Sequence, residues 1–118
     1  MSDSPKDIAY KIYHDLLDKR QLQLCDTLFD ENCVLHLRRA KALHGRDQYK
    51  KYLEKWLQEN PDLKYDVKDI IAEENKVAVR WEEHDTAKDL HSRAQIFLHI
   101  TNNKVTEGWE IWENLTEE

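Results

Sequence analysis

Two kinds of ionisable side chain in this sequence could move protons on a bound molecule. Glu107 and Glu110 lie close together in the C-terminal region, and histidines occur at positions 36, 84 and 99. A carboxylate or an imidazole acts as a general acid or base when an apolar environment brings its pKa close to the working pH. A second hydrogen-bond donor can then stabilise the oxyanion that develops on the substrate. These residue types are therefore typical of acid–base chemistry on a small molecule.

The last predicted strand, residues 104–115, leaves the choice of acid open. Simple alternation puts Glu107 on the same face as Val105 and Trp109, and an acid in an apolar, core-facing row is a good pocket candidate. A β-bulge would reverse this alternation and turn Glu110 inward instead. A solvated acid at an interface or edge is the structural alternative for both residues.

His36 is the third catalytic candidate, on a short predicted strand over residues 34–37. Its neighbours Leu35 and Leu37 alternate with it, so the pattern is equally compatible with an imidazole that faces solvent. His84 and His99 are predicted to point outward from their strands. No histidine pair has the helical i, i+4 spacing of a zinc site, and there is no glycine-rich phosphate loop. The sequence thus gives no positive case for a metal ion or another cofactor.

Aromatic side chains give a second indication of a binding site. The four that fall on inward rows are expected to wall an apolar cavity and contact its ligand: Tyr13, Trp56, Trp81 and Trp109. The hydroxyl of Tyr13 is also a candidate donor to a ligand oxygen. Core packing and a dimer interface account for most aromatic residues in a domain of this size.

Helical elements are expected in the first half of the chain. Ser4 can cap a helix that has Pro5 in its first turn, and Asp7 is placed to complete a capping box. A short second helix is predicted over residues 21–29. A third begins at Asp47 and ends at Asn60-Pro61, because proline disfavours a helical residue before it.

After Pro61 the apolar period changes from helical to two-fold. Long strands are predicted on both sides of three turns, at residues 74–76, 89–91 and 102–103, with a bulge at Ile70-Ile71. Helices followed by consecutive hairpins predict an α+β domain whose antiparallel sheet carries helices on one face. Large residues on both faces of the last two strands, such as Phe97 and Trp109, further predict a homodimer, because large apolar patches rarely stay exposed.

Size and charge restrict the class of protein. A chain of 118 residues is long enough for one domain, here residues 1–118, and too short for two. The net charge of −6 argues against nucleic acid and anionic membrane as partners, and no apolar segment reaches the roughly 18 residues of a membrane span. The first residues lack the pattern of a secretory signal. Cys25 and Cys33 are expected to be buried thiols in a reducing compartment, so we expect a cytoplasmic protein.

One run of basic residues interrupts the acidic composition. It is best explained as a solvated helix face, with a phosphate or an acidic partner as the alternative. Its members are Arg38, Arg39, Lys41, Arg46, Lys50, Lys51 and Lys55.

Three motifs, in this order, resemble the NTF2-like superfamily and its SnoaL-like (polyketide cyclase-like) members. His44-Gly45-Arg46-Asp47 resembles the family's turn into its third helix, and Val77–Trp81 resembles its central strand. Asn103–Trp112 resembles its closing hairpin, where an acid follows a tryptophan. The resemblance implies a cone-shaped fold with three N-terminal helices packed on a curved antiparallel sheet, and dimers formed by the open sheet faces.

The resemblance favours Glu110 as the functional acid, because Glu110 follows the tryptophan of that hairpin. The chain departs from many SnoaL-like proteins at Gly108, where those proteins have a histidine. The family implies no single reaction. One expectation is a cofactor-independent isomerase, cyclase or hydrolase that uses acid–base chemistry on an apolar small molecule in the cone pocket. The alternative is a non-catalytic module that binds a ligand or a protein.

Overall fold

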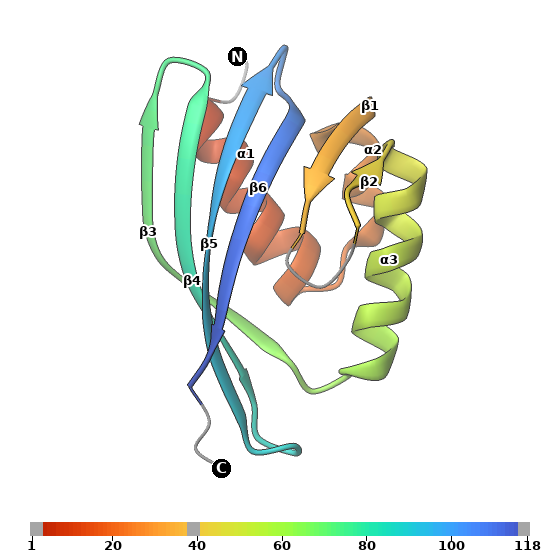
Figure 1. Ribbon diagram of the computed structural model, residues 1–118, viewed down its shortest axis with the longest axis vertical. Coiled ribbons are helices and arrows are strands. Elements are labelled where there is room, and N and C mark those ends of the chain that lie inside the picture. Colours follow the sequence, from red (N-terminus) through yellow and green to blue (C-terminus); the bar gives the residue numbers. More distant parts are fainter. Residues whose placement is uncertain (1–3, 38–40, 116–118) are drawn as a thin grey trace.

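The computed structural model describes residues 4–37 and 41–115. A six-stranded sheet forms one layer, with the strand order β2-β1-β6-β5-β4-β3 (Figure 1). Neighbouring strands are antiparallel except β1 and β6, which are parallel. The strands are β1 (Phe29–His36), β2 (Leu43–His44), β3 (Lys64–Glu73), β4 (Lys76–Asp85), β5 (Leu90–Thr101) and β6 (Lys104–Asn114).

Helices cover the inner face of this curved sheet and confirm the predicted α+β fold (Figure 1). The first is α1 (Pro5–Lys11), which continues without a break into the π-helical segment η1 (Ile12–Asp18). Ser4 and Asp7 form the capping box, with two hydrogen bonds of 3.2 Å between each backbone N–H and the other side chain. The 14-residue helix α3 (Arg46–Glu59) lies beside β1 and β2. No helix in the described ranges is long and apolar enough to cross a membrane.

Two predicted elements have different bounds. The second helix is reduced to one 3₁₀ turn, η2 (Leu22–Leu24), and one α turn, α2 (Cys25–Leu28). Phe29 is already extended and begins β1, so this strand starts well before residue 34, because Phe29 pairs with Val105 of β6. The bulge predicted at Ile70-Ile71 lies instead between Val67 and Asp69.

The remaining turns follow their residue types. Asn102 and Asn103 both have positive φ, 53° and 65°, which is the conformation of a type I′ hairpin.

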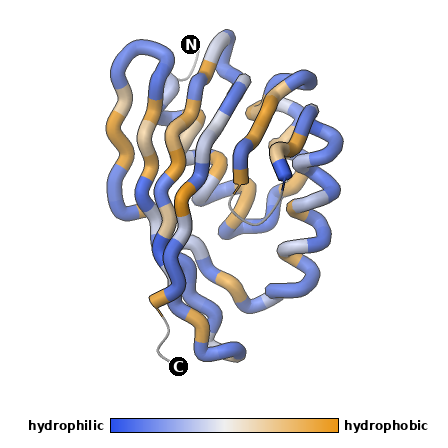
Figure 2. The backbone as a smooth tube through the Cα atoms, in the orientation of Figure 1, coloured by the Kyte–Doolittle hydropathy of each residue, from blue (hydrophilic) through white to orange (hydrophobic). Residues whose placement is uncertain are grey.

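Apolar residues occupy the middle of the strands and hydrophilic residues the hairpin turns (Figure 2). Along β4, Val77, Val79 and Trp81 are buried and alternate with more exposed residues. The core therefore lies between the inner sheet face and the helices.

Arg20, which follows η1, holds the connection between α3 and β3 in place through hydrogen bonds. Its guanidinium donates hydrogen bonds to four backbone oxygens, those of Leu57 (3.3 Å), Asn60 (3.1 Å), Pro61 (3.3 Å) and Leu63 (2.6 Å). The residue itself has a positive φ of 63°. A buried carbonyl without a hydrogen-bond partner is costly, so one side chain satisfies a segment that lacks regular structure.

Candidate functional site

A β-bulge in β6 decides which acid faces the core. His99 pairs with Glu107 and Ile100 pairs with Val105, so Thr106 is an extra residue in the ladder. Two residues then oppose one, and the alternation of side chains reverses. As a result Gly108 and Glu110 lie on the inner face, whereas Glu107 lies on the outer face.

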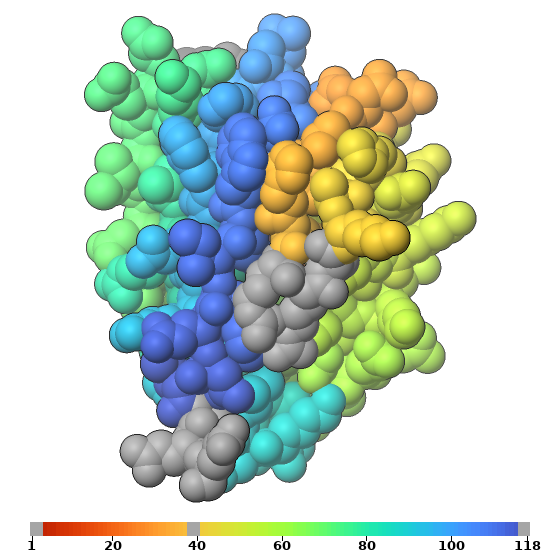
Figure 3. Space-filling view, viewed as in Figure 1, coloured from red at the N-terminus to blue at the C-terminus, as the bar shows by residue number. Residues whose placement is uncertain are grey.

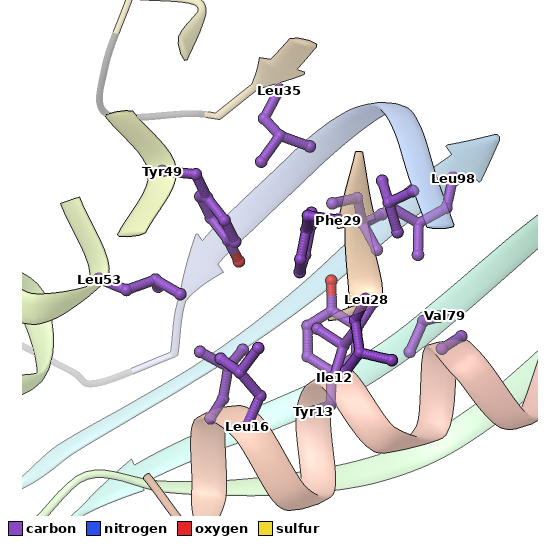
Figure 4. Packing of buried hydrophobic residues seen from close by; sticks show 14 of the residues in the cluster. Ile12, Tyr13, Leu16, Leu28, Phe29, Leu35, Tyr49, Leu53, Val79 and Leu98 are labelled. Atoms are coloured by element: carbon purple, nitrogen blue, oxygen red, sulfur yellow. The ribbon is translucent and has the colours of Figure 1, made fainter. Parts of the chain in front are cut away.

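A cavity lies between the inner sheet face and the helices, with a free interior of about 50 Å³. Tyr13 and Tyr49 project toward one another from η1 and α3 (Figure 4). The wall is formed mainly by aromatic and aliphatic side chains, together with two acids. The lining residues are Tyr13, Leu17, Phe29, Leu35, Leu37, Tyr49, Tyr52, Leu53, Trp56, Tyr65, Trp81, Glu83, Ile96, Leu98, Glu110 and Trp112.

Glu83 is the second acid of this cavity and is not among the predicted site residues. Its side chain is on the inner face of β4, the residue is only 5% exposed, and its carboxylate accepts a hydrogen bond of 2.9 Å from Nε1 of Trp81. Val79, Trp81 and Glu83 share one alternating row, and this row is the signal by which the sequence could have identified Glu83. Asp85 continues the row, but its carboxylate accepts from the backbone N–H of Lys88 in the following turn.

Three of the four tyrosines that line the cavity are buried. Burial raises the pKa of Tyr13, Tyr49 and Tyr65 well above 10, and the negative charge of Glu110 raises it further in each case. These phenols therefore stay protonated and can donate hydrogen bonds at neutral pH. Nε1 of Trp56 donates to Oη of Tyr65 at 2.9 Å, which fixes the position of this hydroxyl.

Tyr13, Trp56 and Trp81, three of the four aromatic residues predicted to line the cavity, do so. Tyr13 stacks on Trp81 with ring centroids 4.3 Å apart. Trp109 does not belong to the described lining. The bulge turns it to the outer face, where it is 38% exposed.

His36 and Glu107 are brought together, but outside the cavity. Nε2 of His36 lies 2.9 Å from a carboxylate oxygen of Glu107, and the two side chains are 40% and 38% exposed. The ring of His36 stacks on Trp109 at 5.5 Å. The space-filling view shows this outer surface, where β6 lies between β1 and β5 (Figure 3). Of the three predicted catalytic residues, only Glu110 lines the cavity.

A side chain at position 108, such as the histidine of many SnoaL-like proteins, would require two leucines to move. A Cβ atom at position 108 would lie 2.9 Å from Cδ2 of Leu98 and 3.2 Å from Cδ2 of Leu35. These leucines fill the space that a side chain would need. The inner row of β6 thus offers Glu110 without a neighbouring imidazole at position 108.

Arg46 and Lys50, two members of the basic run, have structural partners. Arg46 donates to the backbone oxygens of Asp26 and Phe29, and Lys50 lies 3.3 Å from the Asp26 carboxylate. Arg38 and Arg39 lie outside the described residues. Cys25 and Cys33 are buried as predicted, and burial raises their pKa values to about 12 and about 11.

Comparison with known proteins identifies the family. The family model of the SnoaL-like polyketide cyclases matches residues 7–118. No match was found among curated proteins. Three solved structures share the fold at low sequence identity.

The first is wild-type IdmH from Streptomyces antibioticus, 18% identical, with a TM-score of 0.85 over 97% of this chain and 95% of that one. The second is a provisionally assigned ketosteroid isomerase from Kribbella flavida, 22% identical, with a TM-score of 0.80 over 97% and 81%. The third is a SnoaL-like polyketide cyclase from Agrobacterium tumefaciens, 18% identical, with a TM-score of 0.78 over 98% and 95%. The chain, with its curved sheet and enclosed aromatic cavity, therefore belongs to the SnoaL-like polyketide cyclase family of the NTF2-like superfamily.

Proposed function

We propose that this protein is a cofactor-independent enzyme of the isomerase, cyclase or hydrolase type that performs acid–base chemistry on an apolar small molecule in the cavity. One observation carries the proposal. Two carboxylates from different strands, Glu83 and Glu110, face the same aromatic cavity as three protonated phenols. Proton transfer at carbon needs this combination of a base and an oxyanion donor in an apolar site. Membership of the SnoaL-like polyketide cyclase family supports this class of chemistry.

Glu110 is assigned the role of the base. It is only partly buried, whereas Glu83 is almost fully enclosed and is held by the Trp81 indole. The Glu110 carboxylate takes a proton from the carbon next to a substrate carbonyl, and the C–H electron pair moves into the carbonyl to form an enolate. A phenol of the cavity donates a hydrogen bond to the enolate oxygen. Return of the proton from Glu110 to another carbon completes an isomerisation. In a ring closure the enolate carbon attacks a second carbonyl of the same molecule, and the alkoxide that forms takes the proton from Glu110.

Glu83 is assigned a positioning role. Its hydrogen bond holds the indole of Trp81, on which the Tyr13 ring stacks. Because Tyr13 is a candidate oxyanion donor, the row from Glu83 to Tyr13 fixes the place at which the substrate oxygen binds.

The experiment compares two acids of the same strand. Exchange of α-protons of small cyclic ketones for deuterium in D₂O reports proton abstraction whatever the final product is. Glu110→Gln should slow this exchange by a factor of about 10² to 10⁴, the usual contribution of a general base. Glu107→Gln is the matched control and should leave the rate unchanged, because its side chain lies on the outer face. Equal rates for the wild type and Glu110→Gln, with both folded by circular dichroism, would contradict the proposal.

The alternative is a non-catalytic module that binds a ligand or a protein. The small free interior favours it, because about 50 Å³ is far below the roughly 300–1,000 Å³ of typical ligand pockets. An enzyme with this cavity must widen it when substrate binds. Ketones that bind with no exchange at any pH would support the module and exclude the enzyme.

We further propose that the protein is a homodimer that pairs through the outer sheet face. Four large apolar side chains are exposed there: Ile71 (71%), Phe97 (40%), Trp109 (38%) and Ile111 (73%). They line one shallow hollow of about 400 Å³. A second copy of the same face would cover this apolar surface. The buried, unpaired thiols of Cys25 and Cys33 support a reducing, cytoplasmic location.

A further inference from the structure

We propose that Glu82, His84 and His91 form a site for a divalent transition-metal ion of the zinc type at the end of the β4–β5 hairpin. The site lies on the outer sheet face, away from the cavity. It does not depend on the proposed enzymatic function, because it shares no residue with the cavity lining.

The pairing of two strands brings the three side chains together. His84 of β4 is directly opposite His91 of β5. Glu82 lies two residues before His84, so the two side chains share one face of the strand. The two imidazole rings are stacked with centroids 4.2 Å apart. The strand pairing therefore brings the three side chains together without a bound ligand.

The donor atoms already converge on a small volume. One oxygen of Glu82 lies 2.8 Å from Nε2 of His91 and 3.5 Å from Nε2 of His84. All three ligand atoms lie within 4.8 Å of one another. Ligands of a tetrahedral zinc ion at about 2.0–2.2 Å are about 3.3–3.6 Å apart, so small side-chain rotations suffice to admit the ion.

The chemistry of the donors fits zinc and its neighbours in the transition series. Two imidazoles and one carboxylate are a common zinc donor set, and three protein ligands leave a position for water or a fourth ligand. Glu82 supplies a carboxylate oxygen from a side chain that is 23% exposed. The Lys68 ammonium also faces Glu82, but it forms an ion pair of 2.7 Å with Asp66. Asp66 itself faces His84 and adds a second negative charge beside the site.

The sequence signal for this site is a strand spacing. Metal ligands on a helix recur at i and i+4, but ligands on a hairpin recur at i, i+2 and across the turn. Glu82, His84 and His91 follow the second pattern, which only the register of β4 and β5 makes visible.

The test measures zinc binding by the untagged chain. Isothermal titration with ZnCl₂ should show one ion bound per chain, and zinc at 100 times the dissociation constant should raise Tm by several degrees, reversed by EDTA. The His84→Gln and His91→Gln variants should each weaken binding at least about tenfold. The matched control is His44→Gln, because His44 is an exposed histidine in the short strand β2. His44→Gln should bind as the wild type does.

Two results would overturn the site. One is a wild-type chain that binds no zinc in the titration. The other is equal affinity in the wild type and in the His84→Gln/His91→Gln double variant, which would place the ion elsewhere. Thermal melts without zinc show whether each variant is folded, and the titration is interpreted on folded protein only. A Co²⁺ titration provides a second readout, since visible absorption that disappears in the double variant reports imidazole ligation directly.

Discussion

The two faces of the sheet carry the same residue types and use them differently. On the inner face, Glu110 lines the same cavity as the buried tyrosines and as Glu83, which is hydrogen-bonded to the indole of Trp81. On the outer face, Glu107 pairs with a histidine, and about two-fifths of each of these side chains is exposed. The two acids are three residues apart in one strand. Burial, and not residue type, therefore gives Glu110 an environment that can support catalysis.

The difference depends on the bulge at Thr106. Without this extra residue, strict alternation would place Glu107 inside and Glu110 outside. The ladder between β5 and β6 thus decides which acid meets the cavity and which meets solvent. Three measurements test this difference between the two faces.

The largest expected effect is a loss of stability in alkali that arises from the inner face. Burial raises the pKa of Tyr13, Tyr49 and Tyr65 well above 10, whereas in the unfolded chain phenols ionise near 10. Below pH 10 both states keep these protons. Above it only the unfolded state releases them, so the free energy of unfolding should fall by up to about 1.4 kcal/mol per pH unit for each phenol.

Urea denaturation between pH 9 and 11.5 measures this slope. The thiols of Cys25 and Cys33 act in the same direction from pH 9, because burial raises their pKa values too. Tyr65→Phe should make the slope shallower, and Tyr10→Phe, at a residue that is 45% exposed, should leave it unchanged. An equal change in both variants would show that the inner phenols are not specially protected.

A smaller effect is expected on association through the outer face. Ile111→Lys puts a charge into the exposed apolar hollow and should raise the dimer dissociation constant at least about tenfold. The same substitution at the exposed Tyr10 of α1, Tyr10→Lys, is the control and should leave association unchanged. Sedimentation velocity at micromolar concentration measures both. A wild-type chain that sediments as a monomer would contradict the dimer.

The smallest effect is expected for the outer ion pair. Exposed pairs contribute less than about 1 kcal/mol, so His36→Gln in the Ile111→Lys background, at a concentration where sedimentation shows a monomer, should change the free energy of unfolding by no more than this. Urea denaturation at pH 7 is the measurement. A larger loss in the parent chain than in the monomeric variant would support the proposed dimer, with the second copy covering the pair. A large loss in the monomer would mean that the two faces are less different than their exposure indicates.

The sequence predicted the fold well because its local signals agree. The capping box at Ser4, the change of period after Pro61 and the Asn102-Asn103 turn each depend on neighbouring residues only. The site was harder to predict, since it depends on register. The Thr106 bulge arises from the pairing of β6 with β5, and the residue types within β6 do not predict it. Tyr13, Trp56 and Trp81 could be placed from their inward rows, and the family resemblance favoured Glu110. Glu83 was missed, although its position in an alternating apolar row could have indicated it.

The hydrogen bonds of the Arg20 guanidinium set the width of the cavity, although the Arg20 side chain does not line it. Trp56 and Tyr65, which are hydrogen-bonded to one another across the cavity wall, flank the connection whose carbonyls Arg20 holds. Moving α3 away from β3 would break several charged hydrogen bonds at once, so a hinge at this connection is strongly disfavoured. Under the proposed function, a substrate larger than the present cavity must therefore be accommodated by rearrangement of side chains rather than by opening of this connection.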